Sequence, residues 1–316
     1  DAIDKYRYTS LTSEGKIPLV EGKILIERDE KNKTLTITDN GIGMNKDDLI
    51  NSLGTIARSG SKDFAAKLKD AKEKKDLNII GQFGVGFYSA FMVASKIVVE
   101  TKKYDEPGYR FTSDGEESYT IEEIDKKDVG TSITLYLKKD TKEVKYEDYL
   151  SEYKIKDLVT KYSDYIRYPI MMEVEKSVPE LDKDGKEIEG KTKTVKELDT
   201  LNSMIPLWKK NKKEVTDEML NDFYKSKFSD YENPFTSLFV RVDGVVSYDA
   251  LLFIPSHAPY NLYSDTYEKG LQLYSKGIFI KDKCPELIPD YLKFVKGLVD
   301  SDGFNLNISR EILQDS

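Results

Sequence analysis

A glycine-rich segment directly before an apolar stretch limits the possible folds of this chain more than any other feature. Gly81, Gly84 and Gly86 precede apolar residues from about Phe87 to Ala94, which predicts a tight turn, a helix and then a strand at Ile97–Thr101. The glycines either serve a turn that needs positive φ angles, or they leave backbone N–H groups free at a helix start, where phosphate binds. The segment has neither the Gly-Lys-Ser/Thr of a Walker loop nor the glycine spacing of a dinucleotide fingerprint.

A second glycine motif, DNGIGM at Asp39–Met44, follows apolar runs at Ile24–Ile26 and Leu35–Ile37 that predict a β-hairpin. Asn-Gly is a strong signal for a hairpin turn, so a simple turn is one interpretation of the motif. The alternative is that Asp39 ends a strand inside a pocket, where its carboxylate accepts a hydrogen bond from the exocyclic amine of adenine. The two glycines of the motif would then let the backbone approach the base closely.

A third segment follows a helix predicted at Asp47–Ile56, whose apolar residues have helical spacing. The stretch Leu53–Gly60 is either the glycine-terminated end of that helix with a basic last turn, or a loop that places Arg58 beside a phosphate or ribose. Small and charged residues dominate from Ala57 to Asn78, which indicates a mobile surface segment that could act as a lid.

Composition excludes several classes of protein. A net charge of −8, from 49 Lys and Arg against 57 Asp and Glu, argues against a nucleic-acid partner, and no apolar run approaches the ~20 residues that cross a bilayer. A single cysteine, Cys284, and a single histidine, His257, leave no internal disulfide or structural zinc site and favour the cytoplasm. The chain starts at Asp1 within a predicted helix, so we expect an upstream segment to be missing.

The length of 316 residues predicts two domains. We expect a nucleotide-binding domain at 1–175, a polar hairpin or linker at 176–203, and the first part of a second, α/β domain at 204–316. Further strands are predicted in the first domain at Tyr109–Phe111, Tyr119–Ile124 and Thr131–Leu137. The second domain should contain a helix near Pro289–Val299 and strands at Phe239–Val242, Ala250–Ile254 and Ile278–Ile280.

The motifs together resemble the heat-shock protein 90 family of molecular chaperones. DNGIGM, LGTIARSGS, GQFGVGFYSAFMVA and GTSITLYL occur in the order and approximate spacing of that family's ATPase domain. Downstream, IPLWKKN, FYKSKF, LLFIPSHAPYNLY and LNISREILQ resemble its middle domain, most closely in the bacterial members. The resemblance implies an α+β protein: an N-terminal two-layer α/β sandwich of the gyrase, histidine-kinase and MutL ATPase superfamily, followed by an α/β middle domain.

The resemblance also implies the residues of an ATP site. Asp39 would contact adenine, Gly43 and Met44 would line the base, and Thr131 would complete the adenine side. The remaining nucleotide-binding positions would be Ser52, Arg58, Ser59, Gly60, Gly84, Val85, Gly86 and Phe87. Two of these depart from the family pattern, because Arg58 occupies a position that is usually lysine and Ser52 one that is often asparagine.

The catalytic residues that the resemblance implies lie near the end of the chain. Arg310 would reach the γ-phosphate, with Gln314 as a helper one helical turn later, and an arginine fork of this kind is worth about 10³–10⁵ in rate. Taken alone, Arg310 is better interpreted as part of a surface ion pair with Glu311 or a neighbour, and the motif around it reverses that interpretation.

The function that follows is that of an ATP-dependent chaperone, which hydrolyses ATP to drive conformational cycling and client folding. Its cofactors would be ATP or ADP and Mg²⁺, and its partners unfolded or partly folded client proteins and, in the full-length protein, a second copy of the chain. In the family, the water-activating glutamate and the asparagine that binds Mg²⁺ precede the position of Asp1. This chain alone would therefore be a weak or inactive ATPase, and a non-catalytic nucleotide-binding fragment is the alternative.

Two rivals from the same superfamily fit less well. A histidine kinase needs an acceptor histidine on a long helix, and a topoisomerase or mismatch-repair protein needs a basic DNA-facing surface.

Overall fold

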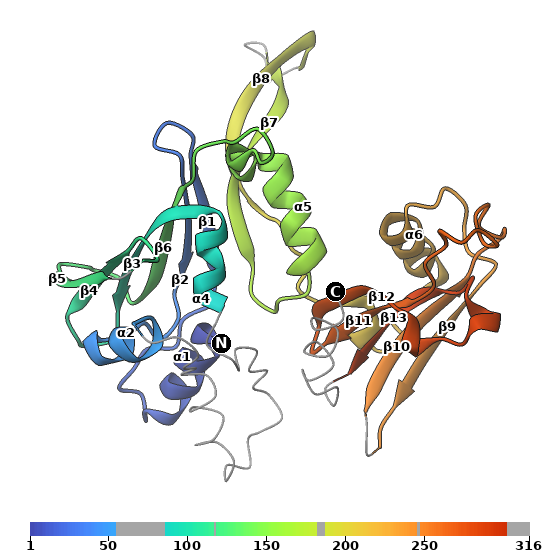
Figure 1. The fold of residues 1–316 in the computed structure, drawn as a ribbon, viewed down its shortest axis with the longest axis horizontal. Helices are drawn as coiled ribbons and strands as arrows, with labels where there is room; N and C mark the ends of the chain where they lie inside the picture. The colour runs from blue at the N-terminus through green and yellow to red at the C-terminus, as the bar shows by residue number, and fades with distance from the viewer. Residues whose placement is uncertain (55–85, 117, 182–186, 245–246, 302–316) are drawn as a thin grey trace. The chain divides into compact units, whose positions relative to one another are not determined.

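The computed structural model describes residues 1–54, 86–116, 118–181, 187–244 and 247–301. The chain divides into two compact units (Figure 1). Unit 1 comprises Asp1–Val159 and Tyr168–Leu201, and unit 2 comprises Thr160–Arg167 and Asn202–Ser316. Residues 176–201 of the segment expected to be a polar hairpin or linker thus belong to unit 1. No helix in the described part of the chain is long and apolar enough to span a membrane.

Unit 1 is built on an eight-stranded sheet with the order β5-β4-β3-β6-β2-β1-β7-β8. All neighbouring strands pair antiparallel except β1 and β7, which pair parallel. The predicted hairpin is confirmed as β1 and β2, and the other strands predicted in the first domain are also present. Their bounds are β1 Ile24–Asp29, β2 Thr34–Asp39, β3 Ala94–Lys102, β4 Gly108–Ser113, β5 Tyr119–Ile124, β6 Gly130–Leu137, β7 Ile170–Leu181 and β8 Glu187–Thr200.

Helix α2 of unit 1 begins where the sequence supplies a cap. α2 (Lys46–Ser52) starts at Asn45 with a capping box, in which the Asn45 side chain accepts a hydrogen bond from Asp48 N–H and the Asp48 carboxylate accepts one from Asn45 N–H. The predicted apolar helix from Phe87 is shorter than expected, because the chain enters β3 at Ala94. The remaining helical elements are α1 Ala2–Thr12, α4 Gly86–Ser89, η2 Ala90–Met92, η3 Tyr146–Leu150 and α5 Glu152–Tyr162, whose last three residues belong to unit 2.

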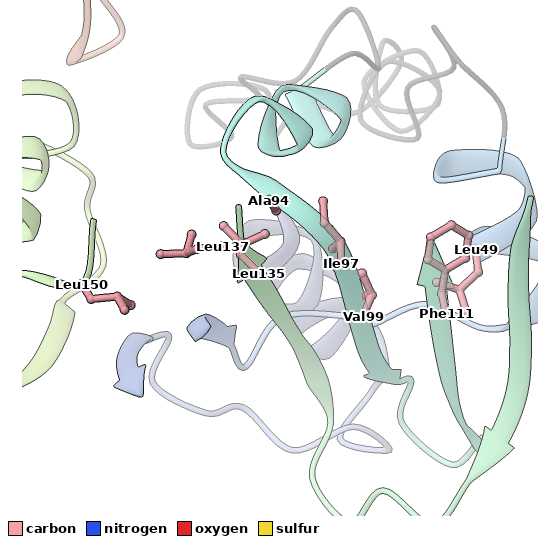
Figure 2. Close-up of a cluster of buried hydrophobic side chains, with 8 residues drawn as sticks. All are labelled: Leu49, Ala94, Ile97, Val99, Phe111, Leu135, Leu137 and Leu150. Carbon is pink, nitrogen blue, oxygen red and sulfur yellow. The ribbon is translucent and has the colours of Figure 1, made fainter. Parts of the chain in front are cut away.

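The two faces of the unit 1 sheet differ in polarity because side chains alternate along each strand. One face carries a buried apolar cluster, and Figure 2 shows part of it along the neighbouring strands β3 and β6. The cluster consists of Leu49, Ala94, Ile97, Val99, Phe111, Leu135, Leu137 and Leu150. On the other face, the hydroxyls of Thr36 and Thr134 lie 3.0 Å apart across β2 and β6. Helix α2 and the short helices before β3 therefore pack on one side of the sheet, in a two-layer arrangement.

Unit 2 is built on a five-stranded sheet with the order β12-β11-β13-β10-β9. The strands are β9 Thr236–Val242, β10 Tyr248–Ile254, β11 Leu271–Ser275, β12 Ile278–Cys284 and β13 Lys296–Ser301, and the main helix is α6 Asp217–Phe228. The prediction of a helix near 289–299 is wrong, because β13 is the central strand there and pairs with both β10 and β11. Both faces of β13 are buried, and the short apolar stretches at 294–295 and 298–299 fit a buried strand as well as a helix.

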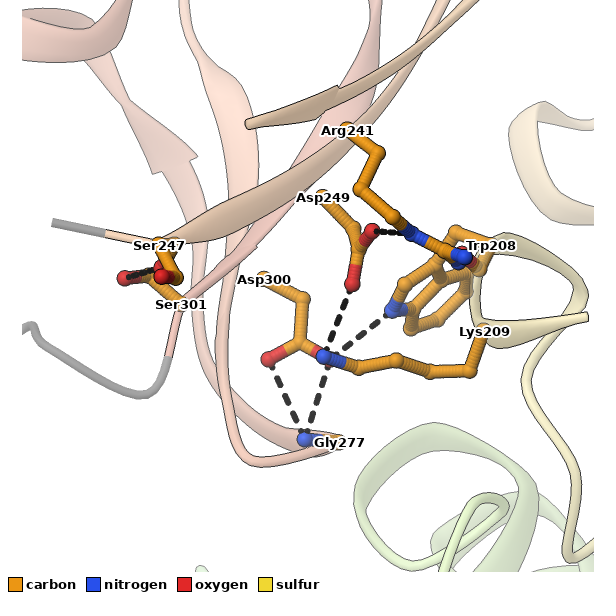
Figure 3. Close-up of polar contacts among 8 residues, drawn as sticks. All are labelled: Trp208, Lys209, Arg241, Ser247, Asp249, Gly277, Asp300 and Ser301. Atoms are coloured by element: carbon orange, nitrogen blue, oxygen red, sulfur yellow. Dashed lines mark hydrogen bonds and ion pairs between the residues drawn. The ribbon is translucent and has the colours of Figure 1, made fainter. Parts of the chain in front are cut away.

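Polar side chains are also buried in unit 2, and they hold β13 to its neighbours (Figure 3). The sole tryptophan, Trp208, is fully buried and donates its indole N–H to Asp300 at 2.8 Å. Asp300 also accepts the backbone N–H of Gly277, and Lys209 Nζ lies 2.9 Å from Asp249 and 3.5 Å from Asp300. Buried carboxylates of this kind are tolerated because each one has partners.

Candidate functional site

Three polar side chains form a row across the sheet of unit 1 at the end of β2. Asp39, the last residue of β2, pairs with Thr131 of β6, and Thr131 pairs with Thr101 of β3. Directly paired residues on antiparallel strands lie on the same face of a sheet. Because Thr101 follows Val99 by two residues, this row lies on the face that also carries the apolar cluster.

The Asp39 carboxylate is partly buried and has a backbone partner. Its Oδ1 accepts a hydrogen bond from Gly41 N–H at 2.8 Å. Burial raises the pKa of the Asp39 carboxyl above its ordinary value, although the Gly41 hydrogen bond and the charge of Lys126 oppose that shift. A carboxyl group whose pKa is shifted by burial at the end of a strand is a candidate for ligand binding.

The loop after Asp39 is not a hairpin turn, because β2 pairs with β1 and β6 and the chain continues from the loop into α2. Asn40 fastens the loop to the segment before β1: its side chain accepts from Lys23 N–H and donates to the carbonyl of Glu21. The backbone N–H of Ile42 donates to the carbonyl of Ala2 in α1 at 3.0 Å.

Gly43 is required by the path of this loop. Its φ angle is +68°, and a Cβ atom there would lie 2.0 Å from the carbonyl oxygen of Lys102. Gly130, at the start of β6, has a φ of +124°, and its Cβ would lie 2.1 Å from the carbonyl oxygen of Asp39. At Gly43 and Gly130 the backbone thus lies closer to its neighbours than a residue with a Cβ atom allows.

Thr101 joins the loop to the row of polar side chains. Its Oγ1 accepts a hydrogen bond from Met44 N–H at 2.9 Å and lies 2.9 Å from Thr131 Oγ1 and 3.2 Å from the carbonyl oxygen of Gly130. Thr101 is not among the site residues predicted from the sequence. A signal was present, because a polar residue continues the buried apolar positions Ile97 and Val99 on the same face of β3.

The structure brings four of the predicted site residues to this end of the sheet: Asp39, Gly43, Met44 and Thr131. Ser52 is the last residue of α2, and Gly86 is exposed at the start of α4. Phe87 packs edge-on against Phe91 and Phe111 in the apolar cluster. The other predicted residues lie outside the described part of the chain: Arg58, Ser59, Gly60, Gly84, Val85, Arg310 and Gln314.

Acceptors and glycines at this end of the sheet suit a planar base that carries an amine. The Asp39 carboxylate is an acceptor, and the Thr131 hydroxyl can donate or accept. A metal site is not evident beside them. Among the residues that the structure describes, no group of three or more His, Cys, Asp or Glu could hold a metal ion.

Both halves of the chain match known protein families. Residues 174–316 match the family described as Hsp90 protein, and residues 21–146 match the family described as histidine kinase-, DNA gyrase B-, and HSP90-like ATPase. Chaperone protein HtpG of Clostridium acetobutylicum is 51% identical over 99% of this chain. HtpG of Shouchella clausii and of Alkaliphilus metalliredigens are 48% and 49% identical over 99% of the chain. In each case the match covers 49% of the relative, so the chain spans about half the length of the curated relatives it matches.

Proposed function

Because this chain belongs to the Hsp90 family, we propose that it binds ATP and ADP at the Asp39 end of its eight-stranded sheet and acts as part of an ATP-driven chaperone. The observation that carries the proposal is the placement of the Asp39 carboxylate, partly buried beside Thr131 and a loop that only glycines can form. The HtpG relatives are named as chaperones, which supports the same function here.

Adenine recognition follows from the hydrogen-bonding groups at this site. Asp39 would accept a hydrogen bond from the exocyclic amine of the base, with Gly43 and Met44 against the ring. Burial disfavours the charged form of Asp39, and a donor from the ligand would offset part of that penalty. The same residues would reject a base that presents a carbonyl oxygen at this position, because two acceptors would then face each other.

Hydrolysis would require groups beyond the base site. We propose that Arg310 stabilises the charge that builds on the transferring phosphoryl group and that Gln314 assists it. Mg²⁺, when bound with the nucleotide, would neutralise phosphate charge. In the full-length protein, replacement of Arg310 by alanine should lower the hydrolysis rate by at least about 10³ while ADP affinity stays unchanged. A variant with normal turnover would remove Arg310 from the mechanism.

The proposal includes a conformational switch, in which nucleotide favours a closed arrangement through its different contacts in the two states. Nucleotide should then change the protease sensitivity of residues 57–78. Unfolded client proteins, a cytoplasmic location and assembly of the full-length protein as a homodimer belong to the same proposal. If protease cleaves residues 57–78 equally with and without ADP, the conformational switch is refuted. Nucleotide binding itself is tested separately, by calorimetry.

Calorimetric titration of Mg-ADP tests the binding site directly. We expect the protein to bind ADP and Asp39→Asn to lose most of that binding, because the amide presents a donor where an acceptor is needed. Asp29→Asn is the matched control, since Asp29 also ends a strand of the same sheet but hydrogen-bonds within its own hairpin turn, to Lys31 and Asn32. Equal ADP binding by Asp39→Asn and the wild-type protein would refute the assignment, and so would a wild-type protein that binds no nucleotide.

A further inference from the structure

Lys227 of helix α6 lies against an aromatic wall in unit 2, formed by Tyr165, Trp208 and Tyr274. Its Nζ is 5.6 Å from the centroid of the Tyr274 ring and 5.7 Å from that of the Tyr165 ring. Trp208 packs against both tyrosines, with ring centroids 4.6 Å from Tyr165 and 5.0 Å from Tyr274. Among the residues that the structure describes, no carboxylate lies within 4.0 Å of the Lys227 amino group.

Burial governs the protonation of Lys227. The loss of water around the amine lowers its pKa below the ordinary value, and the more distant carboxylates Asp164 and Asp282 oppose that shift. The two ring faces also attract an ammonium, but they lie near the limit of about 6 Å for that attraction. At a given pH, a larger fraction of Lys227 than of a solvent-exposed lysine is therefore neutral.

A neutral lysine amine is a nucleophile, whereas an ammonium group is not. Lysines in apolar surroundings act as nucleophiles in proteins for this reason. Lys227 is only partly buried, so a small reagent can reach its amino group. It belongs to unit 2, whereas the proposed nucleotide site belongs to unit 1, so its chemistry is independent of the proposed function.

We propose that Lys227 is a site of covalent modification, at which its amine accepts an acyl group from small, uncharged acyl thioesters. The amine nitrogen attacks the thioester carbonyl carbon, a C–N bond forms, and the C–S bond breaks as the thiolate leaves with its electron pair. The nitrogen then loses a proton to the thiolate, so the products are an amide and a free thiol. Asp164 and Asp282 would repel an anionic donor, and the planar amide fits against the flat rings of Tyr165 and Tyr274.

The test compares two lysines of one helix. Lys225 also lies in α6, is also partly buried, and pairs its amino group with Asp222 at 3.5 Å. The protein is treated with N,S-diacetylcysteamine, an uncharged thioester, and acetylation of each lysine is quantified by peptide mass spectrometry. We expect Lys227 to be acetylated at least about threefold faster than Lys225 at pH 7.5. Equal or slower acetylation of Lys227 would refute the proposal.

Unfolding supplies the control for intrinsic reactivity. In guanidinium chloride both lysines lose their folded surroundings, so we expect them to react within about twofold of each other. A preference for Lys227 that keeps its full size in the unfolded chain would assign the effect to the local sequence. That result would overturn the inference, because the aromatic wall would then play no part.

An independent measurement follows the protonation of Lys227 without any reagent. Lys227→Met keeps an unbranched, apolar side chain and removes the amine. Because the folded-state pKa is lowered, wild-type stability rises as pH approaches the ordinary pKa of lysine, where the unfolded chain releases the same proton. The free energy of unfolding of Lys227→Met minus that of wild type, measured in urea by Trp208 fluorescence, should therefore fall from pH 7 to pH 10. A constant or rising difference would show that the rings hold a cation, which contradicts the proposal.

Discussion

Gly43→Ala should destabilise unit 1 far more than an ordinary glycine replacement. The φ angle of +68° costs a residue with a Cβ about 1–2 kcal/mol. The new Cβ would also lie 2.0 Å from the carbonyl oxygen of Lys102, so the loop or the end of β3 must shift. Strain of this kind adds about 1–3 kcal/mol, so we expect a total loss of about 3 kcal/mol in the free energy of unfolding.

Two other glycines of unit 1 isolate the contributions. Gly15 has a φ of +84°, and no described residue lies within 4 Å of an added Cβ, so Gly15→Ala should cost about 1 kcal/mol from backbone conformation alone. Gly86 has no positive φ and, among the residues that the structure describes, no neighbour within 4 Å of an added Cβ, so Gly86→Ala should be close to neutral. Urea unfolding followed by far-UV circular dichroism measures all three variants on the transition of the same unit. The reasoning is refuted if Gly43→Ala is no less stable than Gly15→Ala.

Three further predictions concern buried charges. Burial raises the folded-state pKa of Asp39, so its ionisation destabilises the fold as pH rises through that pKa. Asp39→Asn should therefore become more stable relative to wild type between pH 4 and pH 7, measured by urea unfolding. A variant whose stability relative to wild type falls steadily over this range would contradict the prediction. Asp300→Asn should destabilise unit 2 by about 3 kcal/mol, read from Trp208 fluorescence, whereas Asp222→Asn, in an exposed pair with Lys225, should cost less than about 1 kcal/mol. The Tyr224 hydroxyl and Lys296 hold the pKa of Asp230 at about 2, so the stability that Asp230 contributes above its ordinary pKa is lost as pH falls through about 2. Tyr224→Phe should begin acid unfolding at a higher pH than wild type, and coincident acid transitions would refute this role.

The hairpin and the strand β6 were predictable because their apolar residues alternate and turn residues flank them. Asp39 was predictable for a different reason: a carboxylate beside two glycines at a strand end is a local pattern, visible without the fold. The cap at Asn45 is also local, since both of its hydrogen bonds lie within four residues.

Features that depend on distant pairing were harder to predict. Residues 296–301 form the central strand of unit 2 because β10 and β11 flank them, and the few apolar residues at 294–299 alone do not separate a buried strand from a helix. Helix α6 had a usable signal that was overlooked: Thr216 caps it, acidic residues fill its first turn, and Leu220 and Tyr224 are buried one turn apart.

Thr101 shows the same limit within the site. The alternation with Ile97 and Val99 marks Thr101 as a buried polar residue, but its partners Met44 and Thr131 are distant in sequence and no local pattern identifies them. The register of β2, β6 and β3 brings Asp39, Thr131 and Thr101 together, and that register is a property of the whole sheet.

A crystal structure of the protein with Mg-ADP bound would test the central claim most directly. We predict that the exocyclic amine of adenine lies about 2.7–3.2 Å from a carboxylate oxygen of Asp39, with the base against Gly43 and Met44 and beside Thr131. A nucleotide bound with its base elsewhere, or with its amine directed away from Asp39, would contradict the account.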